Sequence, residues 1–149
     1  MKKIALAFAT VLITISSAGA QILKPVKWQF GAKKLNDHEA VVFMKATINN
    51  GWHIYSQHLE DGGPIPTSFS FKSSPDYTLV GQPAEPKAKT KYEEVFDMDV
   101  AYFDNQVVFQ QKVKLTKGAT SVRGAVEFMA CNATQCLPPD EVEFTVAIK

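Results

Sequence analysis

The stretch Ala40-Val41-Val42-Phe43-Met44-Lys45-Ala46-Thr47-Ile48 shows most clearly how this chain folds. One set of its side chains, Ala40, Val42, Met44, Ala46 and Ile48, falls on one side of an extended backbone, and Val41, Phe43, Lys45 and Thr47 fall on the other. Such alternation with a period of two residues predicts a half-buried β-strand. We expect the first set to face an apolar core.

The same alternation recurs three times further along the chain. The inward sets are Val107, Phe109, Val113 and Leu115, then Val122, Val126 and Phe128, and finally Phe144, Val146 and Ile148. Aromatic and β-branched residues dominate these segments, as is typical of pleated sheets. Turn signals separate the segments, namely Asn49-Asn50-Gly51, residues 61–66, residues 73–76, Asp104-Asn105 and Lys117-Gly118.

These signals predict the fold class. We interpret Asp104-Asn105 and Lys117-Gly118 as hairpin turns and the charged stretch 85–94 as a long loop. No segment carries a helical stripe with caps. Seven to nine short strands with regular turns are typical of an all-β fold, an antiparallel β-sandwich whose two sheets bury their alternating sets against each other.

Composition limits the function classes. The chain has 149 residues, of which 46% are hydrophobic and 21% are charged, so it fits one globular domain and not a disordered segment. The formal net charge is +1. Proteins that neutralise phosphates usually carry a larger basic excess, so we expect no nucleic-acid partner.

The first twenty residues have the pattern of a secretory signal peptide. Lys2 and Lys3 precede an apolar run over residues 4–15, and Ala18-Gly19-Ala20 fits the small-residue cleavage pattern. We expect cleavage after Ala20, a soluble mature domain over residues 21–149 and delivery to an oxidising compartment. An uncleaved anchor is the alternative, although the run is short for a membrane span.

The chain has two cysteines, Cys131 and Cys136, with four residues between them. In an oxidising compartment this pair can form a disulfide. As a structural cross-link, a loop of about six residues contributes roughly 2.2 kcal/mol in the chain-entropy treatment. The alternative is a redox-active pair. Cys131 continues the less buried side of its strand, so we expect an exposed sulfur that points away from the main core.

A metal site is not favoured by the sequence. The three histidines, His38, His53 and His58, lie far from the cysteines along the chain, and two thiols do not complete a tetrahedral zinc site. We expect neither a metal nor another cofactor.

Several segments resemble one known family. They are residues 128–139, with the cysteine pair followed by Pro138-Pro139, the run Gly51-Trp52-His53-Ile54-Tyr55-Ser56, residues 63–67, and residues 92–96 with 100–103. They are similar to the N-terminal periplasmic domain of the thiol:disulfide interchange protein DsbD. This resemblance covers nearly the whole mature chain, and its most specific element is the cysteine pair followed by two prolines.

The resemblance implies an immunoglobulin-like sandwich that passes electrons as a protein-disulfide reductase component of the periplasm. Cys136 is then the attacking cysteine and Cys131 the resolving one. Partners would be thioredoxin-fold proteins and a membrane-embedded thiol reductase. The family's cap loop would correspond to Glu93, Glu94, Val95 and Phe96, with Val95 or Phe96 covering the sulfurs, and His53 and Tyr55 would lie near them.

A purely structural role remains an alternative for each of these residues. Exposed glutamates need no special role, and a single histidine in a strand is more often structural. The chain as a whole could instead be a secreted β-sandwich that binds protein or glycan and carries a passive structural disulfide. The redox behaviour of the cysteine pair distinguishes the two functions.

Overall fold

The computed structural model describes residues 22–149, so the predicted signal peptide, residues 1–20, lies outside the described residues. Residues 22–149 form eleven β-strands, more than the seven to nine expected, and contain no helix of the length and apolarity needed to cross a membrane. Every strand pairing is antiparallel. The all-β, antiparallel fold class is confirmed.

One layer of the sandwich is a four-stranded sheet with the order β1-β2-β8-β5. Its members are β1 (Val26–Asn36), β2 (Glu39–Ile48), β8 (Gln106–Leu115) and β5 (Tyr77–Ala84). The five β2 side chains predicted to face the core are at most 4% exposed. The alternation of the opening stretch therefore sets which face of this sheet is buried.

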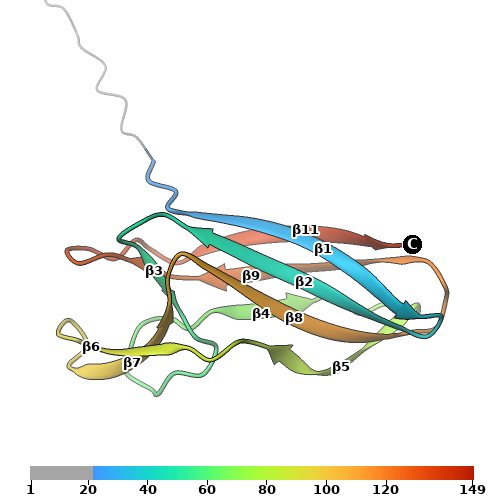
Figure 1. Cartoon of the computed structure of the whole chain (residues 1–149), viewed down its shortest axis with the longest axis horizontal. Coiled ribbons are helices and arrows are strands. Elements are labelled where there is room, and N and C mark those ends of the chain that lie inside the picture. Colours follow the sequence, from blue (N-terminus) through green and yellow to red (C-terminus); the bar gives the residue numbers. More distant parts are fainter. Residues whose placement is uncertain (1–21) are drawn as a thin grey trace, which may run out of the picture.

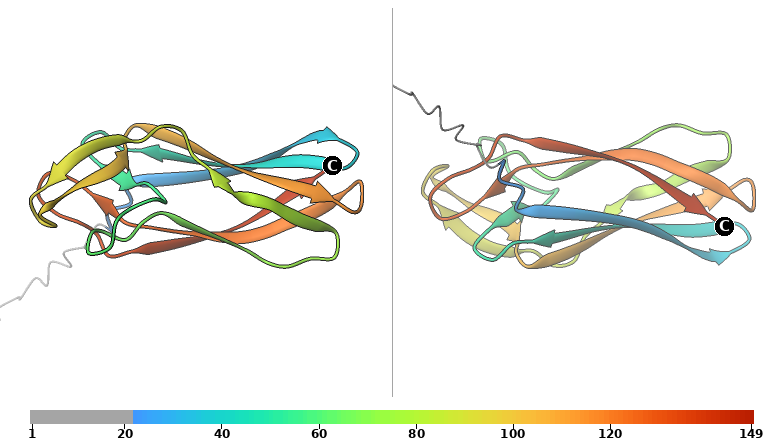
Figure 2. Two further views of the ribbon diagram at one scale, coloured as in Figure 1. Left: turned by 90° about the horizontal axis from the view of Figure 1, so that it is seen from below. Right: turned by 90° about the horizontal axis from the view of Figure 1, so that it is seen from above.

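The opposite layer is a three-stranded sheet with the order β11-β9-β4. Its members are β11 (Asp140–Ile148), β9 (Thr120–Phe128) and β4 (Ser68–Phe71). Figures 1 and 2 show the two layers lying face to face, with their strands running along the long axis of the molecule. The predicted inward residues of β8, β9 and β11 are all buried in one core, which also receives the ring of Trp28, 6.1 Å from Phe109. These contacts confirm the sandwich.

A third sheet lies at one end of the sandwich, on the left in Figure 1. Its order is β10-β3-β7-β6, with members β10 (Ala130–Cys131), β3 (His53–Tyr55), β7 (Met98–Phe103) and β6 (Lys89–Glu93). One face contributes Ile54, Phe103 and Ala130 to the main core. The other face carries a second apolar cluster of buried Tyr55, Val100 and Cys131, with Leu59, Met98, Tyr102 and Met129 packed around it.

The connections between the sheets differ from two sequence predictions. Asn49-Asn50-Gly51 forms a turn as expected, with Gly51 at a positive φ of 81°. Asp104-Asn105 and Lys117-Gly118 are turns but not hairpins, because the strands on either side of each belong to different sheets. In a layered fold the chain must cross between sheets, and short polar turns serve for crossing as well as for hairpins.

The prediction of a loop over residues 85–94 is also wrong, because this stretch contains β6. Within residues 22–149 that strand pairs only with β7, and it forms the edge of its sheet. Edge strands carry charged residues that discourage further pairing, so their sequences lack the apolar alternation that identifies inner strands. The charges of β6 include Lys91 and Glu93, which take part in the site described next.

Candidate functional site: a disulfide at one end of the sandwich

Cys131 and Cys136 form a disulfide that closes a short loop after β10. The loop is also closed by its backbone, since Asn132 N donates to Gln135 O at 2.8 Å and Leu137 N donates to Ala130 O at 2.9 Å. The Asn132 side-chain oxygen accepts hydrogen bonds from the backbone N–H groups of Thr134 and Gln135, both at 2.9 Å. The loop that carries the two cysteines is thus closed by hydrogen bonds as well as by the sulfur–sulfur bond.

The two sulfur-bearing residues differ in exposure. Cys136 is exposed, whereas Cys131 is fully buried, so the expectation of an exposed Cys131 is wrong. The reason is that β9 ends at Phe128 and the chain enters another sheet at Ala130, so both residues of β10 are covered. As expected, Cys131 points away from the main core, because it belongs to the second cluster.

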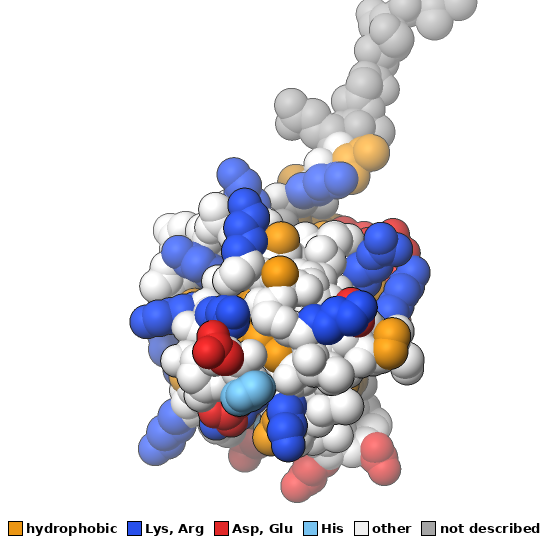
Figure 3. Space-filling view, turned by 90° about the vertical axis from the view of Figure 1, so that its right-hand side faces the viewer, with side chains coloured by type: hydrophobic (Ala, Val, Ile, Leu, Met, Phe, Trp, Pro, Cys, Tyr) orange, Lys and Arg blue, Asp and Glu red, His pale blue; other side chains and the backbone are white. Residues whose placement is uncertain are grey.

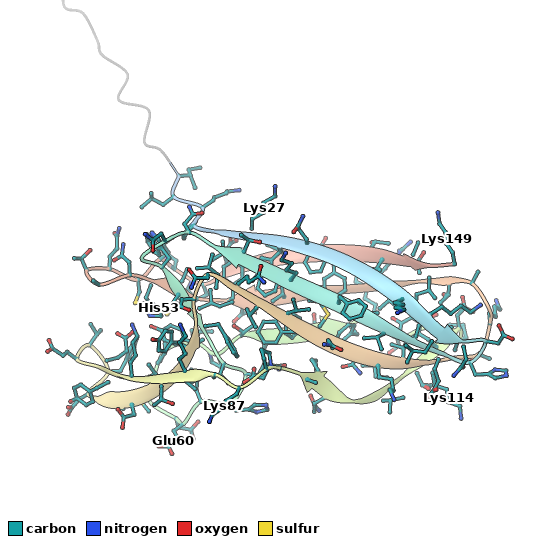
Figure 4. All side chains as sticks on the ribbon, in the orientation of Figure 1. Lys27, His53, Glu60, Lys87, Lys114 and Lys149 are labelled. Atoms are coloured by element: carbon teal, nitrogen blue, oxygen red, sulfur yellow. A yellow bond between two sulfur atoms is a disulfide. The ribbon has the colours of Figure 1, made fainter. Side chains whose placement is uncertain are left out.

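His53 and Tyr55 lie on β3 beside this cysteine. Cys131 and His53 are direct partners in the antiparallel pairing of β10 with β3, so their side chains emerge on the same face of the sheet. Tyr55, two residues further along, lies on that face as well and packs in the cluster with Cys131. The structure therefore brings both residues to the disulfide end of the molecule, where Figure 4 labels His53.

Glu93 links this pair to the edge strand. Its Oε1 atom lies 2.9 Å from His53 Nε2, accepts a hydrogen bond from the Tyr55 hydroxyl at 3.2 Å, and lies 2.8 Å from Lys91 Nζ. The side chains of Glu93 and His53 are only 11% and 6% exposed. One carboxylate oxygen thus satisfies three polar groups in a poorly hydrated position, where such hydrogen bonds are strong and their loss is costly.

Burial and charge shift the ionisation of this group of side chains. Burial, together with the Lys91 ammonium, lowers the pKa of His53 against the opposing effect of Glu93. Burial alone would raise the pKa of Glu93, but the hydrogen bond and charge of Lys91, with His53 and Tyr55, hold it below its ordinary value. Burial and the neighbouring Glu93 raise the pKa of Tyr55. At neutral pH the arrangement holds a carboxylate, a neutral imidazole and a neutral phenol.

The other three residues of the expected cap loop form the tip of the β6–β7 hairpin. Glu94 is exposed, Val95 is 79% exposed and Phe96 is half-buried. The tip is a tight turn in which Phe96 N donates to Glu93 O at 3.1 Å. The hairpin and the loop after β10 lie at the same end in both views of Figure 2. The two glutamates are therefore unlike, since Glu93 points into the polar group and Glu94 faces solvent.

Three features of the site were not found from the sequence. Lys91 was assigned to a loop, although it is the cation that accompanies Glu93. The Asn132 turn has a recognisable signal, an Asn whose side chain accepts from the backbone two and three residues on. A groove of about 540 Å³ borders the loop and is lined mainly by apolar residues, among them Ile22, Leu23, Leu137, Pro138, Pro139 and Val142.

An antiparallel sandwich with a cysteine pair in a tight loop at its rim defines a class of small disulfide-bearing β modules. The family described as "Thiol:disulfide interchange protein DsbD, N-terminal" matches residues 19–148, and the chain belongs to that family. The fold is accordingly the immunoglobulin-like sandwich that the family resemblance implied.

Solved structures show the same fold. The DsbD N-terminal domain of Neisseria meningitidis in its reduced form is 18% identical, with a TM-score of 0.52 over 79% of this chain and 83% of that one. The same domain in complex with the PilB N-terminal domain gives 18% identity and a TM-score of 0.55 over 84% and 87%. The N-terminal periplasmic domain of ScsB from Proteus mirabilis gives 14% and 0.52 over 83% and 44%. A search of curated proteins found no match.

Proposed function

We propose that this protein is a periplasmic thiol-disulfide exchange module that transfers electrons through the Cys131–Cys136 pair. The observation that carries the proposal is the unequal exposure of the two cysteines at one end of the fold. An exchange site needs one sulfur that an incoming disulfide can reach in line and a second that is held back to resolve the intermediate. Exposed Cys136 suits the first task, and buried Cys131 suits the second.

The reaction begins with the reduced pair. The Cys136 thiolate attacks one sulfur of a partner disulfide, a mixed disulfide forms, and the other partner sulfur leaves as a thiolate. Cys131, as its thiolate, then attacks Cys136, so that the Cys131–Cys136 bond forms and the partner leaves as a dithiol. Two electrons pass to the partner. Reduction of this protein by a donor dithiol follows the same steps in reverse.

The hydrogen-bonded loop supports repeated cycling of this kind. The bonds of Asn132 and of the backbone that close residues 130–137 involve no sulfur atom, so we expect them to keep the two thiols close after reduction. High effective concentration of the second thiol favours rapid resolution of a mixed disulfide.

We propose thioredoxin-fold proteins as the partners and a membrane-embedded thiol reductase as the electron donor. The resemblance of this chain to its family implies both kinds of partner, and two solved relatives support a periplasmic exchange role. One DsbD N-terminal domain forms a complex with the PilB N-terminal domain, and the ScsB domain is described as periplasmic. The signal-peptide pattern of residues 1–20 agrees with export to that compartment.

We further propose that the β6–β7 hairpin shields and tunes the pair. A half-buried Phe96 at the hairpin tip supports it as the shielding side chain in preference to Val95, which is 79% exposed. The Glu93 carboxylate is anchored by His53 and Tyr55 and also pairs with Lys91 Nζ at 2.8 Å. This ion pair leaves little net negative charge beside Cys131, so the hairpin acts chiefly by covering the reduced pair until a partner displaces it.

A trapping experiment tests the proposed function. The Cys131→Ala variant is reduced and mixed with oxidised thioredoxin, and the products are separated on a non-reducing gel. We expect a mixed disulfide with Cys131→Ala, because attack by Cys136 can occur but resolution by Cys131 cannot. The matched variant Cys136→Ala should give little or none, since its remaining thiol is buried. Absence of a trapped species with Cys131→Ala, in protein shown by circular dichroism to be folded, would contradict the proposal.

A further inference from the structure

The charges of this protein are separated along its long axis. The strand registers divide residues 22–149 into two halves, and the half away from the disulfide comprises residues 31–43, 71–84, 110–124 and 144–149. That half has eight basic and three acidic side chains, a net charge of +5. The half that holds the disulfide has six basic and twelve acidic side chains, a net charge of −6. A net charge near zero therefore conceals a strong charge dipole.

The basic side chains surround the end of the sandwich opposite the disulfide, which Figure 3 views directly. They come from β1, the β4–β5 loop, β8, the β8–β9 turn, β9 and the residue after β11, and comprise Lys33, Lys34, Lys72, Lys112, Lys114, Lys117, Arg123 and Lys149. Figure 4 places Lys114 and Lys149 at this end and His53 at the other. We call these eight residues the basic end.

Little of this positive charge is neutralised within the protein. Lys34 lies 3.8 Å from Asp37 and Lys117 lies 3.0 Å from Asp76, and the other six residues of the basic end form no ion pair with any residue in the described range 22–149. All eight side chains except that of Lys34 are exposed. The positive potential of this end is therefore available to a partner.

We propose that the basic end is a docking surface for an anionic lipid bilayer. A folded protein partner is usually bound through a few aromatic or aliphatic side chains that fill a pocket at the centre of the interface. Here the hollows that border both Lys72 and Arg123 are lined mainly by polar side chains and offer no apolar pocket for such an anchor. The charges are instead spread around the whole end, as Figure 3 shows, which suits a plane of mobile anionic headgroups better than one fixed partner surface. Leu35, 48% exposed beside Lys34, can enter the interfacial region while the lysines contact headgroups.

This docking has a consequence for the disulfide. The anionic bilayer attracts the basic half and repels the acidic half. The long axis of the protein therefore points away from the plane of the bilayer. Cys136, in the loop that follows β10 at the far end of the sandwich, would then face outward. The main contribution to this docking is electrostatic. Added salt should therefore weaken it, because ions screen charges that are farther apart than the Debye length, which is about 10 Å at 0.1 M.

Vesicle co-sedimentation tests the proposal with the whole mature protein. Vesicles of mixed phosphatidylglycerol and phosphatidylcholine are compared with vesicles of phosphatidylcholine alone, at low and high salt. The basic-end variant carries Lys33→Gln, Lys72→Gln, Lys114→Gln and Lys149→Gln. The control variant carries Lys24→Gln, Lys27→Gln, Lys45→Gln and Lys87→Gln, which removes the same charge from the acidic half and breaks no described ion pair.

We expect the native protein and the control variant to bind the phosphatidylglycerol vesicles at low salt and to be released at high salt. Each removed lysine should weaken partitioning about fivefold, so the basic-end variant should bind at least about a hundredfold more weakly. Equal losses in the two variants, equal binding to phosphatidylcholine, or no binding by the native protein would overturn the proposal. So would binding to soluble polyglutamate without binding to vesicles, which would assign this end to an acidic protein segment.

Discussion

His53 Nε2 and Glu93 Oε1 lie 2.9 Å apart, and this contact joins the strand beside Cys131 to the edge strand β6. The hairpin proposed as the cap belongs to the same sheet as the disulfide, and this contact reaches across β7 to tie its edge strand to β3. Both side chains are largely buried, so neither can exchange its partner for water without cost. The hairpin is consequently anchored at its base by Glu93, whereas Val95 at its tip is 79% exposed.

The two glutamates of the hairpin should differ sharply in their effect on stability. Glu93→Gln leaves His53, Tyr55 and Lys91 without their shared carboxylate, and we expect it to lower the free energy of unfolding by about 1–3 kcal/mol. Glu94→Gln serves as the control and should change it by less than about 0.5 kcal/mol. Urea unfolding of both variants measures the difference, and equal effects would show that the Glu93 contacts contribute nothing.

Stability should fall in mild acid because of His53. Its pKa is lowered in the folded protein, so the unfolded chain takes up the proton first as the pH falls below about 6.5. Folding is then progressively disfavoured until the pH passes the lower, folded-state pKa. The groups that face the ring, Lys91 and Glu93, oppose each other in this shift. Glu93 adds a loss at still lower pH, because its pKa is also lowered.

The pH effect can be assigned with a pair of histidine variants. The free energy of unfolding is measured in urea at neutral pH and at about pH 5.5. His53→Gln should reduce the decrease between these two conditions, whereas His58→Gln, which alters an exposed histidine, should leave it as in the native protein. An unchanged decrease in His53→Gln would show that another group causes it.

Asn132 should set the redox equilibrium of the pair. Asn132→Ala removes the acceptor that shapes the loop, so the two thiols are less well placed to reform the bond. At about 1–2 kcal/mol for the lost hydrogen bonds, the reduction potential should become less negative by roughly 20–40 mV. Thr134→Ala, which removes one side-chain bond to Asn132 and keeps the backbone turn, should shift it less. Equal potentials for Asn132→Ala and the native protein would rule out this role.

Removal of the shielding side chain should make the reduced pair more reactive. Phe96→Ala is expected to speed oxidation by hydroxyethyl disulfide on the order of tenfold, because a small uncharged disulfide then reaches the sulfurs more easily. Val95→Ala should have little effect, since its side chain is 79% exposed. The rates follow from thiol titration with time. The reverse order of the two variants would assign the shielding to Val95.

Much of the fold could be predicted from the sequence, because strands inside a sheet alternate between apolar residues that face the core and polar residues that face solvent. The inward residues of β2 predicted from the opening stretch are buried, and so are those of β8, β9 and β11. The edge strand β6 was missed for the opposite reason, since its side chains are mostly charged. A short polar turn such as Asp104-Asn105 does not reveal whether the next strand pairs with the last or crosses to another sheet.

The site was predictable only in part. The cysteine pair was found from the sequence itself, whereas the neighbouring site residues were found through family resemblance. The structure brings His53, Tyr55, Glu93 and Cys131 to one sheet face or its edge. The burial of Cys131 could not be predicted, because it depends on a break at Met129 that ends one sheet pairing and begins another. The partnership of Lys91 with Glu93 likewise depends on β6 being a strand.

The most direct test of the account is the redox equilibrium of Cys131 and Cys136 in glutathione buffers of graded potential. The dithiol and disulfide fractions are measured by alkylation and mass spectrometry. An exchange module should titrate reversibly at a potential above about −300 mV, with both forms remaining folded. A pair that stays fully oxidised down to that potential, or a protein that unfolds when the bond opens, would identify a structural cross-link and contradict the proposed function.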